Sequence, residues 1–600
     1  MIIGIDLGTS TSEVSYLRDG KPELIRDIVG SHRGILPSVV GLNPRGSISV
    51  GGDAIGLLSK PGMAVQEIKR EMGKSTRVSL GAEQYSPQEV SSFLLRHLRE
   101  EASRYLGEQI TDAVITVPAY FTDAQRQATE DAGRLAGLNV RRLINEPTAA
   151  ALAYGIERPG VEEKILVYDL GGGTLDVTVL ELSEGYLDVF ASTGNTRLGG
   201  KDFDEALMKH IALECRRATG VDLMASDRGR LRLKPEARRA KESLSSVDHV
   251  TVVFDNIGLR PDGTPIDFDL EITRDQFSQL ILPLVHSTRE QLDEALGAKG
   301  LQTRDIATIL MIGGSTRIPA VRDFVSEYFG GRALKAEVSP DEAVSLGAAV
   351  LAGILDRQLD TSKMVITDVC PFTLGVAVRR EVGDGEYRAG FFDPLIEKQS
   401  TIPRTAKKSY STAVDWQDAV HVQVFQGEAD RCEDNEPITD FHHPMEPAPA
   451  GAEVEIALSY DLNGQVVIVA RDPRTGKETK VEVRVGNGRL SAEERQVSQA
   501  RVDAKWNASA ASQSPPREEV PPKPAPSATP SDEAWKTAPL YQHVAALMAH
   551  AARHLNGYPA PVRAKVAGLL GDMQGALARN DGKTLDRLER QLTDVLFELG

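Results

Sequence analysis

Two short segments combine an apolar run, an aspartate and a turn rich in glycine, a pattern suited to binding phosphate. The first is IIGIDLGTS at residues 2–10, and the second is ILVYDLGGGTLD at residues 165–176. Glycine lets backbone N–H groups approach phosphate oxygens closely, threonine adds a hydroxyl donor, and aspartate can hold magnesium through its waters. The partial repeat predicts two facing halves with phosphates between the turns. The residues concerned are Asp6, Gly8, Thr9, Ser10, Asp169, Gly171, Gly172, Gly173 and Thr174.

A third segment, ILMIGGSTRIPAV at residues 309–321, repeats the order of strand, double glycine and helix start. Gly313 and Gly314 would allow backbone approach, and Arg317 could stack on a base. One such turn is as often a structural hairpin as a ligand site, but three in one chain favour a nucleotide site. Residues 73–75, Gly-Lys-Ser, resemble the end of a P-loop. A P-loop also requires an earlier glycine, at position 68, but that position holds Ile68. We therefore exclude a P-loop enzyme.

An α/β framework is needed to bring these turns together. From Met1 to about Asp356, short apolar runs such as AVITV and TILMIG alternate with helical patterns, which predicts an α/β layer fold. A chain of 600 residues exceeds one hydrophobic core, so several domains are expected. From Val369 to about Val485 the apolar period becomes two, with turn signals between the runs. This period predicts an antiparallel β-sandwich.

The C-terminal part has a different composition. Residues 490–507 suit one short helix, whereas Pro515–Pro530 holds seven prolines in sixteen residues and predicts a tether. Apolar residues at helical spacing then predict a module of three helices. The predicted domains are 1–357 for the nucleotide, 358–368 as a linker, 369–486 as the sandwich, 487–510 as a short helix, 511–538 as the tether and 539–600 as a helical bundle.

Charge and cysteine content narrow the classes of partner. Lys plus Arg number 69 against 86 Asp plus Glu, and the net charge of −17 argues against nucleic acid and anionic membranes. Three widely spaced cysteines in no CxxC pair suggest neither disulfides nor a zinc site. Residues 1–9 lack the features of a signal peptide, and no apolar run is long enough to span a membrane. A cytoplasmic protein is the expectation.

Beyond these motifs, an ordered set of segments resembles the DnaK-type chaperones of the seventy-kilodalton heat-shock protein family. The resemblance spans residues 2–350, continues into the sandwich and is weaker in the terminal helices. It implies an actin-like, two-lobed ATPase domain, a β-sandwich for peptides and a C-terminal lid interrupted by proline. The implied function is ATP-driven binding and release of unfolded polypeptide. The segments are IDLGTS, ITVPAYFTDAQRQATEDAGRLAGL, INEPTAAALAYG, YDLGGGTLD, LGGKDFD, GGSTRIP, SPDEAVSLGAA, TDVCPFTLGV and STIPRTAKKSYSTAVDWQDAVHVQVFQGE.

The resemblance also implies roles for residues in the nucleotide site. Lys69 would face the phosphates, and Glu146 and Asp169 would assist the attacking water, with Thr174 on phosphate. Spacing alone would make Lys69 a solvated surface charge, because an isolated lysine is nearly always exposed. ATP or ADP and Mg²⁺ are the implied cofactors, with the metal held by Asp6 and Asp169 through water. Further nucleotide-binding positions are Gly199, Gly200, Lys241, Ser245, Ser315 and Asp341.

Three departures from the family pattern concern this site. Arg238 stands where the family usually presents Glu to the ribose, which leaves nucleotide affinity open. Asn195 replaces an Asp that helps to hold potassium, so a K⁺ requirement is in doubt. Arg197 and Lys201 replace other usual residues. Only residues 75–87 separate the Lys69 segment from the next helix, so one lobe is shorter than in DnaK.

The sandwich and the linker carry the implied partner sites. A peptide groove would be lined by Val376, Tyr410, Val420 and Val422, with Ala413 helping to close it. An apolar stripe in a strand is more often core than pocket, however, and the period cannot separate the two. Arg379 stands where DnaK has an apolar residue, which favours segments with acidic side chains. Arg142, Asn145 and Asp368 match positions that engage a J-domain cochaperone, although surface charge is the simpler reading. An exchange factor is also implied.

Three other functions are compatible with parts of the sequence. A small-molecule kinase can share the actin-like fold, because fold does not determine function. An actin-like filament protein would also bind nucleotide. Neither needs residues 369–600. A degenerate relative with little turnover stays open because of Arg238 and Asn195.

Overall fold

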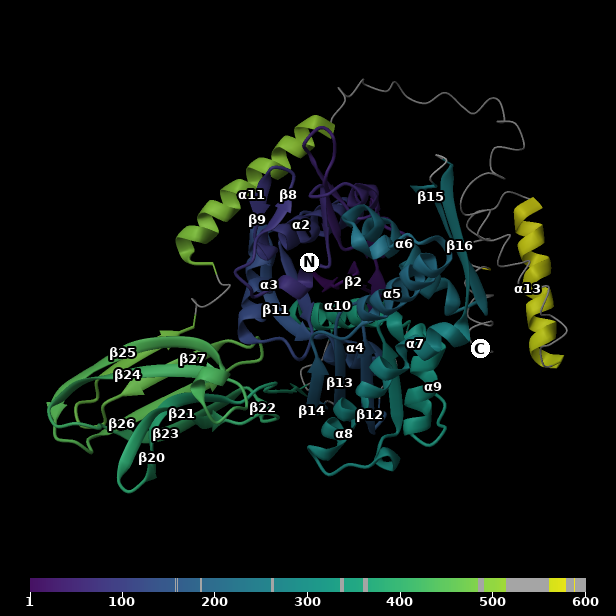
Figure 1. The fold of residues 1–600 in the computed structure, drawn as a ribbon. Helices are drawn as coiled ribbons and strands as arrows, with labels where there is room; N and C mark the ends of the chain where they lie inside the picture. Colours follow the sequence, from purple (N-terminus) through teal and green to yellow (C-terminus); the bar gives the residue numbers. More distant parts are fainter. Residues whose placement is uncertain are drawn as a thin grey trace. The chain divides into compact units, whose positions relative to one another are not determined.

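The fold is known from a computed structural model of the chain (Figure 1). It describes residues 1–156, 158, 160–183, 186–260, 264–334, 339–359, 365–483, 490–513, 560–578 and 588. Residues 1–514 form one compact unit and residues 515–600 another. Within the described part, no helix has the length and apolar character needed to cross a bilayer.

The first lobe is built on a sheet in which β1, β10 and β11 are parallel and β2 and β3 are antiparallel. The strand order is β11-β10-β1-β2-β3, and β4 pairs with β2. Its strands are β1 (Ile2–Leu7), β2 (Thr11–Arg18), β3 (Lys21–Leu24), β4 (Leu36–Pro37), β5 (Val39–Leu42), β6 (Ile48–Val50), β7 (Ala64–Gln66), β8 (Val78–Leu80), β9 (Glu83–Tyr85), β10 (Asp112–Val117) and β11 (Asn139–Asn145). Its helical elements are α1 (Gly52–Ile55), η1 (Gly56–Ser59), η2 (Ile68–Glu71), α2 (Pro87–Leu106), α3 (Asp123–Leu135), α4 (Glu146–Ile156) and α10 (Ala343–Leu355).

The second lobe repeats this plan on a sheet of order β17-β12-β13-β14-β18. Its strands are β12 (Glu163–Leu170), β13 (Leu175–Ser183), β14 (Tyr186–Asn195), β15 (His249–Leu259), β16 (Pro265–Thr273), β17 (Thr308–Ile312) and β18 (Val365–Ile366). Its helical elements are α5 (Gly200–Thr219), η3 (Leu223–Ala225), α6 (Asp227–Leu244), α7 (Arg274–Ser287), α8 (Arg289–Gly297), η4 (Thr303–Asp305), η5 (Gly314–Arg317) and α9 (Pro319–Tyr328). The sequence-based expectation of an α/β fold with apolar strands beginning near residues 2, 113, 165 and 308 is confirmed.

Local sequence signals account for the ends of these helices. Helix α2 begins with a capping box, because Ser86 accepts from the Glu89 N–H while Glu89 accepts from the Ser86 N–H, and it ends at left-handed Gly107. Helix α3 begins with the same kind of capping box, formed by Thr122 and Gln125. These caps place α2 and α3 on the first lobe, where a later element docks.

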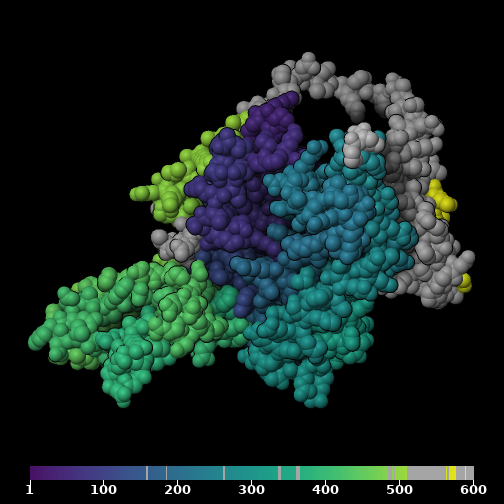
Figure 2. All heavy atoms as spheres, viewed as in Figure 1, coloured from purple at the N-terminus to yellow at the C-terminus, as the bar shows by residue number. Residues whose placement is uncertain are grey.

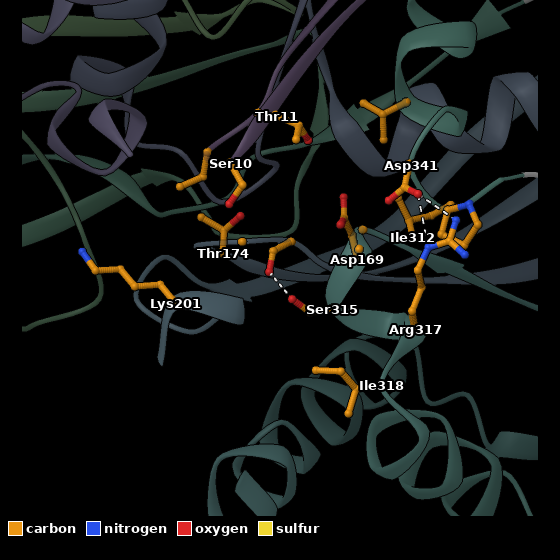
Figure 3. Close-up of a pocket in the computed structure, with 18 of the residues that line it drawn as sticks. Ser10, Thr11, Asp169, Thr174, Lys201, Ile312, Ser315, Arg317, Ile318 and Asp341 are labelled. Atoms are coloured by element: carbon orange, nitrogen blue, oxygen red, sulfur yellow. Dashed lines mark hydrogen bonds and ion pairs between the residues drawn. The ribbon is translucent and has the colours of Figure 1, made fainter. Parts of the chain in front are cut away.

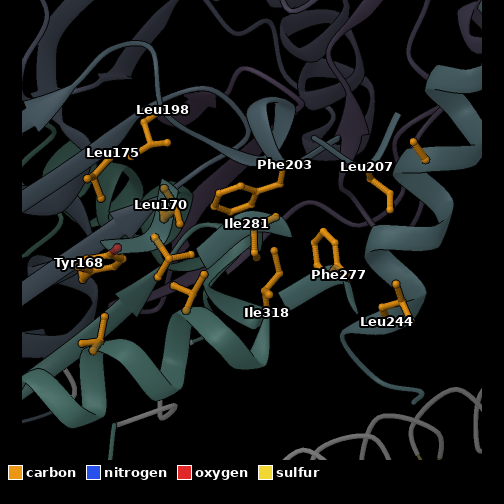
Figure 4. Close-up of a cluster of buried hydrophobic side chains, with 14 of the residues drawn as sticks. Tyr168, Leu170, Leu175, Leu198, Phe203, Leu207, Leu244, Phe277, Ile281 and Ile318 are labelled. Atoms are coloured by element: carbon orange, nitrogen blue, oxygen red, sulfur yellow. The ribbon is translucent and has the colours of Figure 1, made fainter. Parts of the chain in front are cut away.

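Each lobe has its own apolar core. In the second lobe, Tyr168, Leu170 and Leu175 from the sheet pack against Phe203 of α5 and Phe277 of α7 (Figure 4). Such packing holds the ends of β12 and β13, where the aspartates and glycines of the site lie, against the helices behind them.

The sandwich consists, in its described part, of two sheets with four strands each, of order β21-β20-β24-β25 and β23-β26-β27-β28. This confirms the predicted β-sandwich, whose inner faces share one apolar cluster. Ahead of it, β19 (Asp368–Val369) pairs with β22 (Thr401–Ile402). The remaining elements are β20 (Leu374–Gly383), β21 (Glu386–Ile396), β23 (Arg404–Ser411), β24 (Gln417–Gln426), η6 (Cys432–Asp434), β25 (Glu436–Ala448), β26 (Glu453–Tyr460), β27 (Val466–Arg471) and β28 (Glu478–Glu482).

One of these sheets is forked. Strands β20 and β24 pair only from Leu374 with Gln426 to Val376 with Val424. Beyond that point, the described residues of the two strands no longer pair with each other, although β20 continues to Gly383 and β24 begins at Gln417. Each strand instead stays paired in its own hairpin, β20 with β21 and β24 with β25. The two arms are visible in Figure 1.

The C-terminal segments differ in part from the expectation. Helix α11 (Ala492–Gln513) runs past residues 507 and 510, because Asn-Ala-Ser-Ala-Ala-Ser-Gln contains neither glycine nor proline to end it. The first three residues of the predicted tether are therefore helical, and its residues 514–538 lie outside the described part. Of the predicted bundle, the structure describes α13 (Ala560–Ala578) and residue 588.

Candidate functional site

A cleft between the two lobes gathers residues from all three glycine-rich segments. In Figure 2, first-lobe atoms in purple and dark blue adjoin second-lobe atoms in teal. Figure 3 shows Ser10, Asp169, Thr174 and Ser315 around the pocket. The predicted residues that line it are Asp6, Gly8, Thr9, Ser10, Lys69, Glu146, Asp169, Gly171, Gly172, Thr174, Lys241, Ser245, Gly313, Gly314, Ser315, Arg317 and Asp341.

The remaining three predicted glycines, Gly173, Gly199 and Gly200, lie beside the pocket and make its close packing possible. A Cβ on Gly199 would lie 2.5 Å from the backbone nitrogen of Gly173. Gly313 has a φ of 82°, and a Cβ there would lie 2.5 Å from the carbonyl oxygen of Leu170. The turns from the second and third segments therefore touch backbone to backbone, which only glycine permits here.

The centre of the cleft concentrates buried charge. The Lys69 ammonium lies 2.5 Å from the Glu146 carboxylate, and both residues are buried, as are Asp169 and Asp176, whereas Asp6 is partly buried. Burial disfavours the charged form of Lys69, but Glu146, Asp6 and Asp169 outweigh it and raise the pKa of the ammonium. Lys69 is therefore a charged group inside the site and not on the surface.

The carboxylates repel one another. Burial and then the charge of Glu146 raise the pKa of Asp6 to about 6, and burial with Glu146 raises the pKa of Asp169 well above its usual value. Burial and Glu146 also raise the pKa of Asp176 to about 7. One Asp176 oxygen is buried without a hydrogen-bond partner among the described residues. Such an excess of buried negative charge calls for a cation.

Helix α6 lines the other end of the cleft with one face. Arg238, Lys241, Glu242 and Ser245 follow the i, i+3, i+4, i+7 spacing of a single helix face, and all four line the pocket. Arg238 Nε donates to Glu242 Oε1 at 2.9 Å. A carboxylate therefore lies one turn after Arg238 on the same helix face.

The opposite wall of this end carries Arg317. Its guanidinium donates to Asp341 Oδ2 at 2.7 Å and is partly exposed (Figure 3). Lys241 is held by Asp204, with Nζ 2.8 Å from Oδ1, and donates to the carbonyl of Gly200. The cleft is thus anionic at its centre and rich in paired cations around α6 and η5.

The predicted peptide residues lie at the fork in the sandwich. Val376 is the last residue of β20 that pairs with β24, and Val420 and Val422 lie on the β24 arm beyond it. Tyr410 of β23 donates its hydroxyl to Asp393 of β21 at 2.8 Å. Ala413 lies in the exposed loop after β23, and Arg379 is exposed on the β20 arm. Val376 and Val422 are also buried members of the sandwich core, so these two predicted groove residues belong to the core in this structure.

The residues expected to meet a J-domain are largely enclosed in this arrangement. Asn145 Nδ2 donates to Asp368 Oδ2 at 2.7 Å, and Thr148 donates to the same oxygen at 3.1 Å. Asn145 and Asp368 are buried, whereas Arg142 keeps partial exposure. The interpretation of Asn145 and Asp368 as surface charge is wrong for this conformation, because Asp368 of β19 packs against the end of β11 and the start of α4.

Several contacts around the site were not predicted from the sequence. Linker strand β18 joins the second-lobe sheet by pairing with β14, and Gln399 of the sandwich exchanges hydrogen bonds with the Ser192 backbone. Arg70 donates to the carbonyl of Gly173 and to Asp202 across the cleft. Helix α11 docks on α2 and α3, with Arg495 3.1 Å from the buried Asp131. Only tertiary contacts reveal these roles, since the residues follow no local motif.

The fold and the cleft together define a class of protein. Two α/β lobes enclose a cleft with glycine turns, a buried lysine and clustered carboxylates, and a linker strand connects them to a forked β-sandwich. This is an actin-like ATPase whose second lobe is joined directly to a separate binding domain.

Comparisons with known proteins identify the family. The sequence profile described as Hsp70 protein matches residues 2–520. The chain is 41% identical over 499 residues to the chaperone protein DnaK of Thermotoga petrophila, which covers 82% of each chain. It is 40% identical over 510 residues to the chaperone protein DnaK of Thermosipho melanesiensis, with 84% and 83% coverage. The chain belongs to the Hsp70 family and is a DnaK-type, ATP-dependent molecular chaperone.

Proposed function

We propose that the cleft hydrolyses ATP with Lys69, Glu146, Asp169 and Thr174 as its catalytic residues. The observation that carries this proposal is the buried Lys69 ammonium, which lies among carboxylates at the point where the phosphate-binding turns converge. Phosphoryl transfer depends on positioning and charge neutralisation more than on covalent chemistry. Lys69 would contact the transferred phosphoryl group, Glu146 and Asp169 would orient the attacking water, and the Thr9 and Thr174 hydroxyls would donate to phosphate oxygens.

Magnesium fits the same site. Among the described residues, no group of three or more His, Cys, Asp or Glu side chains is arranged to hold a metal directly. Asp6 and Asp169 would therefore hold Mg²⁺ through its waters, as this strongly hydrated ion prefers. When bound, the ion would neutralise phosphate charge. At the position of the Asp that helps to hold potassium in the family, Asn195 offers only a neutral amide, and we therefore propose no K⁺ requirement.

At the nucleoside end, we place the ribose against the α6 face. Lys241 and Ser245 line this end of the cleft, and Glu242 would supply the hydrogen-bond acceptor that Arg238 cannot supply. Arg317 would stack on the adenine, held in place by Asp341.

For the polypeptide client, we place the binding site in the fork between β20 and β24. Two hairpin arms that stop pairing with each other leave two strand edges along which an extended chain could pair. Val420 and Val422 would supply apolar contacts on one arm. Arg379 on the other would favour clients with acidic side chains.

Partners and cycle follow from this assignment. The docked arrangement, with the linker strand in the second lobe and the fork open, would be the ATP-favoured state of a two-state cycle. Hydrolysis would release the linker and close the fork on a client. We further propose a J-domain partner that uses Arg142, Asn145 and Asp368 as the linker undocks, a nucleotide exchange factor, and action in the cytoplasm.

Single-turnover hydrolysis tests the catalytic assignment. In the full chain, Thr174→Ala and Glu146→Ala should each lower the rate at least about tenfold while nucleotide still binds, because both act on the transition state more than on the ground state. Thr251→Ala, at an exposed position of β15, serves as a matched control. An unchanged single-turnover rate in both variants would refute the assignment.

A further inference from the structure

Glu67 has a backbone conformation that residues other than glycine rarely adopt. Its φ is 60° and its ψ is 25°, in the left-handed region. It directly precedes η2, the short turn that carries Lys69. Strain of this kind persists only where the surroundings impose it, and it often marks a functional site.

Both carboxylate oxygens of Glu67 are paired with lysines of the opposite lobe. Lys234 Nζ of α6 lies 2.7 Å from Oε1, and Lys201 Nζ of α5 lies 2.9 Å from Oε2. Only 13% of the Glu67 side chain is exposed. Burial alone would raise the pKa of Glu67, but the two ammonium groups outweigh it and lower that pKa. Glu67 is therefore charged at neutral pH, and its pairing spans the cleft.

A second anchor lies on the other side of Lys69. Arg70 Nε donates to the Gly173 carbonyl at 3.0 Å, and Arg70 Nη2 donates to Asp202 at 2.8 Å. Gly173 and Asp202 both belong to the second lobe, whereas η2 belongs to the first. The side chains of Glu67 and Arg70, on either side of Lys69, thus reach across the cleft, and the Lys69 ammonium contacts Glu146 between them.

We propose that Glu67 is a positioning residue that couples closure of the cleft to the placement of Lys69. Its ion pairs with Lys201 and Lys234 can form only when the lobes are closed, and they hold the strained turn that directs the Lys69 ammonium to the reacting phosphate. An open cleft loses both pairs, so the turn relaxes and hydrolysis waits for closure. This inference rests on the proposed catalytic role of Lys69.

Glu67→Gln in the full chain tests the role of the charge. The variant keeps the size of the side chain but loses both ion pairs. We expect the single-turnover rate of ATP hydrolysis to fall at least about tenfold, with ATP affinity changed less than about threefold, because the pairs act on the reactive geometry. Glu205→Gln removes an exposed pair with Lys209 on α5 and should change neither quantity. An unchanged single-turnover rate for Glu67→Gln would overturn the proposal.

Glu67→Gly separates the ion pairs from the backbone. Glycine adopts a φ of 60° without strain, so the turn can form, but no carboxylate is present. We expect the rate to fall as in Glu67→Gln. A rate equal to that of the unmodified chain would mean that the turn alone places Lys69, and the positioning role would be wrong.

A double-mutant cycle tests whether Glu67 acts through Lys234. Lys234→Gln alone should slow hydrolysis, and combining it with Glu67→Gln should add less than about twofold, because both remove the same interaction. Fully additive losses would contradict the coupling. A lower melting temperature would show that the Glu67 variants fold poorly. The Lys234→Gln variant alone would then test the proposal, because the Lys234 side chain is 31% exposed and its replacement should leave the fold intact. An unchanged rate would then overturn the proposal.

Lys69→Ala, measured in parallel, keeps the two hypotheses apart. If Lys69→Ala hydrolyses ATP normally, the catalytic assignment itself fails. If Lys69→Ala is inactive and Glu67→Gln is fully active, only the positioning role fails.

Discussion

Trp506 of α11 stacks on Phe93 of α2, with ring centroids 6.2 Å apart and an interplanar angle of 13°. Arg96 lies over the same indole at 5.5 Å and pairs with Asp503, and Val502 is fully buried in the first-lobe core. Helix α11 thus closes the apolar core of the ATPase and does not cover the fork in the sandwich. Docking of α11 and opening of the fork belong to one conformation.

Trp506→Ala should therefore weaken the docked state. Loss of the stack and of the buried ring area should cost about 1–2 kcal/mol, or roughly five- to thirtyfold in the docking equilibrium. We expect ATP to accelerate release of a fluorescent peptide at least about fivefold less than in the unmodified chain. Val497→Ala, on the exposed face of α11, is the control. Equal acceleration in all three proteins would show that α11 docking is not linked to the fork.

Val420→Phe tests the fork as the peptide site. Val420 lies on the β24 arm beyond the last pair with β20 and is only partly buried, so a larger side chain should fill the groove and leave the core intact. We expect at least about tenfold weaker peptide binding, measured by fluorescence anisotropy, with little change in melting temperature.

Val424→Phe is the matched core variant for this experiment. Val424 is fully buried and pairs with Val376 inside the sheet, so overpacking there should cost about 1–3 kcal/mol of stability. A comparable fall in melting temperature for Val420→Phe would identify Val420 as core and remove it from the groove.

Glu242→Ala tests the nucleoside end of the cleft. A hydrogen bond to a charged group contributes about 1.5–3 kcal/mol, so ATP binding should weaken at least about tenfold if Glu242 accepts from a ribose hydroxyl. Isothermal titration with an ATP analogue lacking both ribose hydroxyls should show less than about a twofold effect of the same substitution. Glu236→Ala, which removes a pair with Arg239 on the same helix away from the pocket, is the control. An equal loss for both nucleotides would exclude contact with the ribose.

The sequence predicts the fold and most of the phosphate site because both depend on local patterns. Strand β12 and its turn follow from apolar residues, Asp169 and the glycines after it, and the structure brings them to the cleft. The family resemblance also implies that Lys69 lies in the cleft, whereas its isolated position in the sequence predicts an exposed residue. Tertiary contacts decide the position of Lys69, because η2 is tied across the cleft through Glu67 and Arg70.

Contacts between distant segments could not be predicted in this way. From the sequence, Arg238 predicts that a ribose contact is lost. The structure shows that the carboxylate of Glu242 lies on the same helix face and also lines the pocket. The burial of Asn145 and Asp368 depends on how β19 packs on β11 and α4, and no residue pattern encodes that packing. The fork could likewise not be predicted without the strand register, because valines at every second position continue through the point where β20 and β24 stop pairing.

The end of α11 determines where a truncation of the C-terminal segment should begin. A truncation that removes residues 515–600 leaves α11 (Ala492–Gln513) intact. If extended as polyproline, the sixteen residues from Pro515 to Pro530 span up to ~50 Å at ~3.1 Å each, so the effective concentration of the following helices at the fork should be low. We therefore expect this truncation to change peptide dissociation in the ADP state less than about threefold, a difference under ~1 kcal/mol.

A longer truncation that removes residues 490–600 also deletes α11 and its contacts with Phe93, Arg96 and Asp131. Because those contacts stabilise the docked state, this protein should lose most of the ATP-driven acceleration of peptide release, whereas the shorter truncation should keep it. Stopped-flow release of a fluorescent peptide from the full chain and both truncated proteins separates the two segments. Acceleration of ADP-state release by tenfold or more in the shorter truncation would show that residues 515–600 do close the fork, and the tether hypothesis would then be wrong.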